Sequence, residues 1–276
     1  MTSPLPEDAN FDELFGAWDS AHSDFAALAH EVDDTDWSTP SGLPGWTVGD
    51  IVGHVAWIES VLLGRYDPPH EPDWDALPHV TTDFGRVTEI PVDLRRGRTR
   101  QEVLAELDAA LVDRRAELLS GQRDAAEQAT GLLGQTTLGV QLRMRTFDAW
   151  VHEQDIRDAL ARPGHLDSAG ARATASQLIP GLGKAFGKGA QAQLGQALVV
   201  EVTGPVQFTR TVRMGDDGRA RVLDGAADEA DVHLTMDWST YLGLACGRNG
   251  AWSHDVRIEG DRELGERMLR AFCVTP

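Results

Sequence analysis

Residues 141–160 read QLRMRTFDAWVHEQDIRDAL and carry the strongest helix signal in the chain. Their apolar side chains recur at the spacing of one helix face: Leu142, Phe147, Val151, Ile156 and Leu160. The stretch contains neither Gly nor Pro, and Pro163 and Gly164 follow it closely. We therefore predict an amphipathic helix that ends before residue 163, and we interpret the N-terminal half around it.

Two polar residues in this predicted helix, Asp148 and His152, are four positions apart. At this spacing the side chains lie on one face of a helix, where they can supply two ligands to a metal ion. Asp155 follows on roughly the same face. The same spacing is also common on solvated helices, so only a third ligand from elsewhere in the chain would indicate a metal site.

A second helix is predicted over TVGDIVGHVAWIESVLLG, residues 47–64. Thr47 is a favourable N-cap, and the negative charge of Asp50 in the first turn suits the helix dipole. His54 lies within the apolar face of this helix. A single histidine there is often a core residue bonded to a backbone carbonyl, and a metal ligand is the alternative.

Two more amphipathic helices are predicted, one beginning near Phe11 and one over residues 99–119. Four long helices of this kind describe a helical bundle. Residues 67–98, rich in Pro, Asp and charge, are predicted to be a long irregular connection. Four histidines outside the predicted site are assigned to the surface: His22, His30, His70 and His79.

Metal sites in bundles form from inward-facing side chains on neighbouring helices. If the second and fourth helices are neighbours, His54 meets Asp148 and His152 as a set of two histidines and one carboxylate. Such a set leaves a coordination position for water or substrate, which is typical of catalytic rather than structural zinc.

The composition excludes several classes of protein. With 44 acidic and 25 basic residues the formal charge is -19, which opposes binding to nucleic acid or an anionic membrane. No apolar run is long enough to span a bilayer, and the N-terminus has no signal-peptide pattern, so a cytoplasmic protein is expected. Cys246 and Cys273 are the only cysteines, and they form neither a disulfide framework nor a thiolate zinc motif.

The C-terminal part has a different periodicity. Residues 166–196 predict a small-residue helix and a Gly-rich linker containing Lys184 and Lys188, the only lysines. Alternating apolar residues then predict four antiparallel strands, followed by two helices, the second with Asp261 as its N-cap. The predicted organisation is a helical bundle over residues 8–165, a helix and linker over 166–196, and an α+β domain over 197–276.

The stretches LPGWTVGDIVGHVAWIE (43–59) and RTFDAWVHEQDIRDAL (145–160) together resemble the mycothiol-dependent maleylpyruvate isomerase family. The resemblance implies a DinB-like four-helix bundle followed by a small antiparallel sheet with helices, similar to sterol-carrier (SCP2-like) domains. It also implies a divalent metal, chiefly Zn2+, bound by His54, Asp148 and His152. The family's carboxylate is commonly Glu, whereas Asp148 is one methylene shorter.

The family places a glycine-arginine pair near its active site, and Arg248 in the turn of residues 247–250 matches it. A solvated loop arginine is the alternative. Arg210 and Arg213, which alternate on one predicted strand face, are the other candidates for binding a carboxylate substrate, because guanidinium groups bind carboxylates bidentately.

The resemblance therefore implies a metal-dependent enzyme with mycothiol as its thiol cosubstrate and a small electrophile, carrying a carboxylate, as its substrate. Cis-trans isomerisation results if the thiol is expelled again, and S-transfer if it stays. The same residues would also suit a non-catalytic binding protein or a metal hydrolase that uses bound water. The protein is expected to be a monomer or a homodimer.

Overall fold

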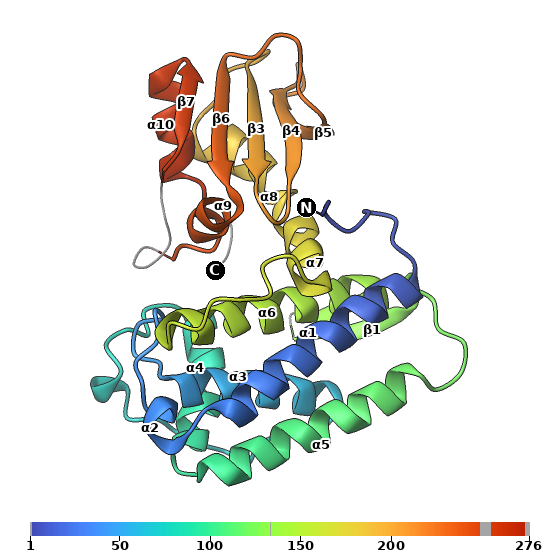
Figure 1. Cartoon of the computed structure of the whole chain (residues 1–276), viewed down its shortest axis with the longest axis vertical. Helices are drawn as coiled ribbons and strands as arrows, with labels where there is room; N and C mark the ends of the chain where they lie inside the picture. Colours follow the sequence, from blue (N-terminus) through green and yellow to red (C-terminus); the bar gives the residue numbers. More distant parts are fainter. Residues whose placement is uncertain (1, 133, 249–254, 274–276) are drawn as a thin grey trace. The chain divides into compact units, whose positions relative to one another are not determined.

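The structure is a computed structural model that describes residues 2–132, 134–248 and 255–273. The chain forms two compact units (Figure 1). One, here called the helical unit, is Asp8–His165, and the other, the sheet unit, is Met1–Glu7 with Leu166–Pro276. The predicted α+β class, with a helical N-terminal region and a C-terminal sheet, is confirmed.

Four long helices form the helical unit: α1 (Phe11–Glu31), α3 (Val48–Leu62), α5 (Arg100–Leu118) and α6 (Leu138–Ala159). Helix α6 packs on α1, and α3 packs on α5 and contacts α6. Large apolar side chains fill the space between them, among them Trp18, Phe25, Ile51, Ile58, Leu107 and Trp150. The predicted bundle of four helices is thus present, and it places α3 beside α6.

The helices that carry the candidate ligands begin where local chemistry predicts. Thr47 and Asp50 form a reciprocal capping box at the start of α3. Next to it Gly49 is required by close packing, because a Cβ there would lie 2.2 Å from the indole nitrogen of Trp37, in the short helix α2 (Asp34–Trp37). Helix α6 is capped by Thr137 and runs without a break through the predicted stretch.

The prediction that residues 67–98 form an irregular connection is wrong for the second half of this segment. It contains a 3-10 turn, η1 (Trp74–Ala76), and the helix α4 (Asp83–Arg96), which packs on α3. The sequence did not indicate this helix because the helix lacks an apolar stripe. Its buried face contains Glu89 and Arg95 beside Val92 and Pro91.

His70 and His79 are also less exposed than expected. His70 donates to Asp93 at 2.7 Å and His79 donates to Glu89 at 3.2 Å, and both side chains are half-buried. Between α5 and α6 the chain forms a short hairpin of β1 (Gln128–Gly131) and β2 (Gly134–Thr137), where the sequence had indicated only a connection.

The sheet unit contains five strands: β3 (Ala197–Thr203), β4 (Phe208–Met214), β5 (Ala220–Asp224), β6 (Val232–Asp237) and β7 (Arg257–Gly260). Their order is β5-β4-β3-β6-β7, as Figure 1 shows. The helices α9 (Trp238–Ala245) and α10 (Arg262–Arg270) contact the sheet, and Asp261 caps α10 as predicted. The first four strands match the predicted ones, and β7 was not predicted.

An antiparallel sheet had been predicted from the sequence. The sheet is instead mixed, because β3 and β6 run parallel. The connection from β5 to β6 returns across the sheet: the Ala227 amide donates to the Thr211 hydroxyl, and the Asp231 amide donates to the Ala197 carbonyl. The connection thereby returns the chain to the edge of the sheet where β3 begins. Strand β6 starts from that same edge and therefore runs in the direction of β3.

The Gly-rich stretch predicted as a linker is helical. After α7 (Ala169–Leu178) the chain forms α8 (Gly181–Lys184) and a π-helical turn, η2 (Ala185–Gly189). The glycines permit close packing: a Cβ at Gly189 would lie 2.3 Å from the Cβ of Ala271, and one at Gly187 would lie 3.3 Å from that of Ala220. Small residues here serve contact between elements and not flexibility.

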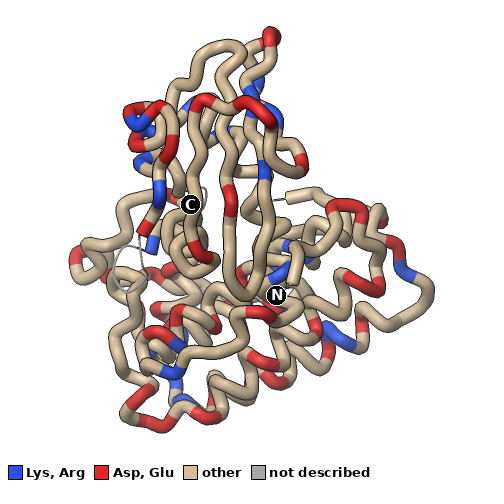
Figure 2. Tube along the Cα trace, turned by 45° about the horizontal axis from the view of Figure 1, so that its top comes forward, with Lys and Arg blue, Asp and Glu red and all other residues tan. Residues whose placement is uncertain are grey.

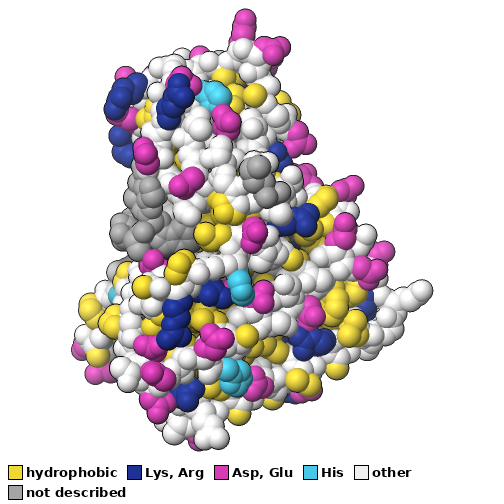
Figure 3. Space-filling view, viewed as in Figure 1, with side chains coloured by type: hydrophobic (Ala, Val, Ile, Leu, Met, Phe, Trp, Pro, Cys, Tyr) yellow, Lys and Arg dark blue, Asp and Glu magenta, His cyan; other side chains and the backbone are white. Residues whose placement is uncertain are grey.

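Acidic residues occur along most elements of both units (Figure 2), in keeping with the formal charge of -19. On the face seen in Figure 3, hydrophobic side chains are interspersed with charged ones. None of the helices in the described part of the chain combines the length and the hydropathy that crossing a bilayer requires.

Candidate metal centre

The three predicted ligands meet inside the helical unit. His54 comes from α3, and Asp148 and His152 come from adjacent turns of α6. One ligand atom from each lies within 4.8 Å of the other two. Asp148 Oδ1 is 3.5 Å from His54 Nε2 and 3.7 Å from His152 Nε2, so both imidazoles face the same carboxylate oxygen. We call these three residues the metal cluster.

His54 does not have the surroundings of an ordinary core histidine. Its side chain is buried, yet its Nδ1 has no hydrogen-bond partner within the described part of the chain, and its Nε2 faces Asp148. The alternative of a histidine held by a backbone carbonyl is therefore not what the structure contains.

The protonation states of the cluster suit a divalent cation. Burial lowers the pKa of His54, so its imidazole is neutral at pH 7 and has a lone pair for a metal. Burial alone would raise the pKa of Asp148, but the guanidinium charge of Arg145, together with the two imidazoles that face the carboxylate, holds it well below its usual range. Two imidazole nitrogens and an ionised carboxylate form a donor set that fits zinc or a similar ion.

Asp155 contacts His152 at the ring nitrogen that does not face Asp148. His152 Nδ1 lies 3.0 Å from Asp155 Oδ2, and Asp155 is buried. Since the carboxylate accepts, Nδ1 carries the proton, and Nε2 is the ring nitrogen left for a metal ion. Metal-binding histidines commonly have such a carboxylate partner. The burial of Asp155 agrees with this role.

Trp46 forms an aromatic wall beside the cluster that the sequence did not indicate. Its ring centroid lies 5.1 Å from that of His54 and 6.2 Å from that of His152. The indole N–H donates to Glu89 Oε2 at 2.7 Å, which fixes the ring. Trp46 lies in the turn before α3, and the φ of +77° at Gly45 could have been anticipated from the Pro44-Gly45 pair.

A buried charge network lies next to the cluster and was also missed. Its members are His22, Glu59, Arg114 and Arg145, all nearly inaccessible to solvent. His22, predicted at the surface, is instead fully buried and donates to Glu59. His30, in contrast, pairs with Asp108 at the surface as expected.

The pKa of Glu59 reflects this network. Burial would raise it, but the charges of His22 and Arg145 hold it below its usual range. The carboxylate is therefore ionised at pH 7 and balances the positive charges around it.

Arg248 belongs to the sheet unit, at the end of α9. Its Nη1 donates to the Cys246 carbonyl at 2.9 Å, and its backbone N–H donates to the Gly243 carbonyl. The rest of the predicted turn, residues 249 and 250, lies outside the described residues. Arg210 pairs with Asp224 and Arg213 donates to the Glu229 carbonyl. A role for any of these arginines in binding substrate stays a prediction.

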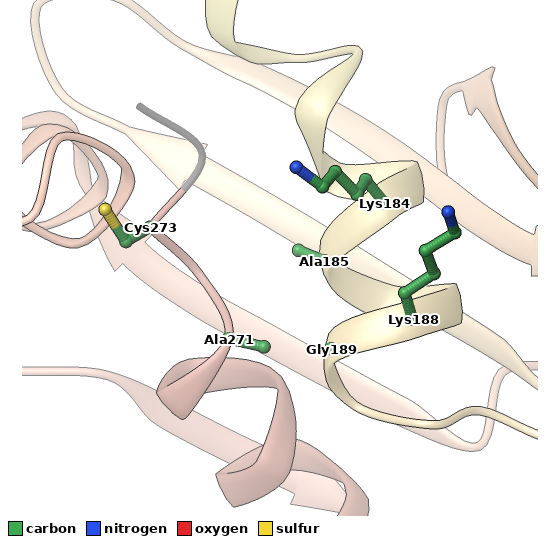
Figure 4. A pocket seen from close by; sticks show the side chains of 6 residues that line it. All are labelled: Lys184, Ala185, Lys188, Gly189, Ala271 and Cys273. Atoms are coloured by element: carbon green, nitrogen blue, oxygen red, sulfur yellow. The ribbon is translucent and has the colours of Figure 1, made fainter. Parts of the chain in front are cut away.

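The sheet unit has a cavity of about 220 Å³ of its own. Figure 4 shows the side chains around it, with two lysines on one helical segment and a thiol across from them: Lys184, Ala185, Lys188, Gly189, Ala271 and Cys273. The Gly-rich stretch thus forms one wall of this cavity.

Comparison with known proteins gives two results. A sequence profile described as "Mycothiol maleylpyruvate isomerase N-terminal domain" matches residues 18–157, which are 140 of the 276 residues and include the whole metal cluster. The crystal structure of a histidine-to-alanine mutant of the mycothiol-dependent maleylpyruvate isomerase is similar in fold, with a TM-score of 0.58 at 14% sequence identity. The similarity covers 94% of this chain and 96% of that chain.

A second crystal structure of the mycothiol-dependent maleylpyruvate isomerase aligns over the same shares of the two chains, with 16% identity and a TM-score of 0.48. No curated protein matches the sequence. At 14% identity the first of these structures establishes the fold alone, and the profile match establishes the relationship of the helical unit.

Proposed function

The chain belongs to the mycothiol maleylpyruvate isomerase family, and from this premise we propose that it is a metal-dependent, mycothiol-dependent isomerase of a small electrophilic substrate. One observation carries the proposal: His54, Asp148 and His152 offer three ligand atoms within 4.8 Å of one another, inside the matched region. Three protein ligands leave a coordination position for an external group, as catalytic metal sites require.

Each residue of the cluster has a separate task. His54 and His152 present their Nε2 atoms as ligands, and Asp148 adds the one negative charge of the set. Asp155 keeps His152 in the required tautomer, and Trp46 covers both rings and limits the access of water. A divalent ion held there, chiefly Zn2+, would lower the pKa of a bound thiol and make it a thiolate nucleophile at neutral pH.

The proposed reaction is cis-trans isomerisation by reversible thiol addition. The thiolate of mycothiol forms a carbon–sulfur bond to one carbon of the substrate's double bond. The π electron pair moves to the other carbon, where a conjugated electron-withdrawing group stabilises it, and the single bond that results can rotate. Breaking the carbon–sulfur bond restores the double bond in the other geometry and returns the thiolate unchanged. No oxidant or reductant is consumed.

Substrate selection is proposed to involve a carboxylate on the electrophile and an arginine of the sheet unit, first Arg248 and otherwise Arg210 or Arg213. A guanidinium group binds a carboxylate through two parallel hydrogen bonds. We further propose that the helical unit is DinB-like and the sheet unit SCP2-like, which the α+β architecture supports at a coarser level.

The test combines metal analysis with thiol binding. The purified protein should contain about one zinc per chain, and calorimetric titration should show mycothiol binding to the zinc form only. Incubation with mycothiol and a cis-configured unsaturated carboxylate should give the trans isomer by NMR, with the thiol recovered.

Four different outcomes would each overturn the isomerase proposal and indicate another function. A stable S-conjugate as the end product indicates an S-transferase. Turnover that does not need a thiol indicates a metal hydrolase. Binding without any turnover, or a protein that binds neither metal nor thiol, indicates a non-catalytic function.

A further inference from the structure

We propose that Arg145 is a positioning residue, which holds one oxygen of Asp148 so that only the other oxygen binds the metal, and that Glu59 fixes Arg145 for this task. The inference rests on the metal site of the proposed function. It concerns Arg145 and Glu59, which do not belong to the metal cluster itself.

The two oxygens of Asp148 have different surroundings. Oδ1 faces the Nε2 atoms of His54 and His152, at 3.5 and 3.7 Å. Oδ2 instead forms an ion pair with Arg145, whose Nη1 lies 3.0 Å away. A carboxylate held in this way cannot turn to bind an ion through both oxygens without losing its contact with the guanidinium group. The contact with Arg145 therefore leaves Oδ1 as the oxygen of Asp148 that can bind a metal ion.

Arg145 can hold Asp148 only if it is itself immobile. Its residue surface is 4% exposed, and its Nε donates to Glu59 Oε1 at 2.7 Å. The guanidinium group thus joins a carboxylate on α3 to one on α6. Because its donors have a rigid planar arrangement, a fixed Glu59 determines the direction in which Nη1 points.

Glu59 is fixed in turn by the rest of the bundle. His22 Nε2 donates to Glu59 Oε1 at 3.1 Å, and Arg114 Nε lies 3.4 Å from Glu59 Oε2. These residues come from α1 and α5, so the buried charge network takes one residue from each of the four long helices. The packing of the whole bundle is thereby coupled to the orientation of one metal ligand.

Charge and position predict opposite effects for Arg145. Its positive charge repels a metal cation, so a purely electrostatic role would mean that its removal strengthens metal binding. A positioning role means that a substitution which keeps the charge and changes the geometry weakens metal binding. Arg145→Lys makes this distinction, because lysine retains the charge but cannot bridge two carboxylates with a planar fork.

The experiment measures Zn2+ affinity by competition with a chelator, and the visible spectrum of the Co2+-loaded protein, for wild type and Arg145→Lys. We expect about tenfold or greater weakening of Zn2+ binding, as for other residues that orient metal ligands. We also expect a changed Co2+ spectrum, because its intensity follows the coordination geometry.

Arg95→Lys is the matched control. Arg95 is also 4% exposed and also joins two carboxylates, Asp67 and Glu106, which are not residues of the metal cluster. This variant should lose stability while keeping its Zn2+ affinity within about twofold of wild type. Equal weakening in both variants would mean that Arg145 acts only through general stability, and would overturn the proposal.

Two further results separate this inference from the function on which it rests. A wild-type protein without stoichiometric metal removes the proposed function and the positioning role together. A wild-type protein that binds Zn2+ with an affinity equal to that of Arg145→Lys overturns the positioning role alone. If Arg145→Lys does not fold, the isosteric Glu59→Gln replaces it, and unchanged Zn2+ affinity there has the same meaning.

Discussion

The helical unit and the sheet unit bury different kinds of side chain. Among the described residues, every buried Asp, Glu, His and Arg belongs to the helical unit, whereas the buried polar residues of the sheet unit are three threonines: Thr174, Thr211 and Thr240. The sheet unit has a core of aliphatic and aromatic residues, such as Leu198, Leu234 and Tyr241.

This difference has an energetic meaning. Buried charges are costly and seldom add more stability than apolar residues of the same size. A unit that keeps a network such as His22, Glu59, Arg114 and Arg145 therefore gives up stability that the apolar core of the sheet unit retains. This cost agrees with the role proposed above for Glu59 and Arg145, which is to orient Asp148 in the adjacent metal cluster.

The largest effect is expected for His152→Ala in the helical unit. Removing one of three ligands should abolish stoichiometric zinc binding and reduce turnover with mycothiol to background, because two protein ligands do not hold the ion. Elemental analysis and an activity assay measure both quantities, with circular dichroism to verify the helical fold. Full zinc content in the variant would remove His152 from the site.

Next in size is the stability effect of Glu59→Ala. It leaves Arg145, Arg114 and His22 without their shared carboxylate, and losing one partner of a buried ion pair costs about 3–5 kcal/mol. Leu234→Ala in the sheet unit should cost about 2–5 kcal/mol by creating a cavity. Urea unfolding measures both. A loss below about 1 kcal/mol for Glu59→Ala would mean that the network contributes little.

The pH dependence of the unfolding free energy should distinguish a substitution of Glu59 from Leu234→Ala. The ordinary pKa of Glu59 is 4.5 and folding lowers it. The stability contributed by this group is therefore complete above about pH 4.5, and it declines as the pH falls below that value toward the folded pKa. Wild type and Leu234→Ala should lose stability steeply as the pH falls from about 4.5 to about 3, and Glu59→Gln less steeply. Equal slopes in urea unfolding across this range would contradict the prediction.

The smallest effect is expected in the sheet unit, for Arg248→Ala. Losing charged hydrogen bonds to a substrate carboxylate should lower kcat/KM about tenfold, with zinc content unchanged. Steady-state kinetics with acidic and neutral electrophiles measure this, and the neutral substrate serves as the control. The assignment of Arg248 fails if the two kinds of substrate are affected alike.

Much of the candidate site could be predicted from local patterns. Helix α6 has a strong apolar period, α3 has a capping box, and His54, Asp148 and His152 lie on faces that those periods define. Other parts could not be predicted, because their signals are not local. Helix α4 buries Glu89 and Arg95, which read as surface residues until the acids and bases that pair with them are known.

The amino-acid sequence by itself determined the four long helices of the bundle, the alternation in strands β3 to β6 and the residue types of the metal cluster, since these depend on neighbours within a few positions. The tertiary structure alone decided which groups support the cluster. Glu59 lies 37 positions from His22 and 86 from Arg145, and no local period relates them. The parallel pairing of β3 and β6 is likewise set by how the chain returns across the sheet, which the strand residues themselves do not encode.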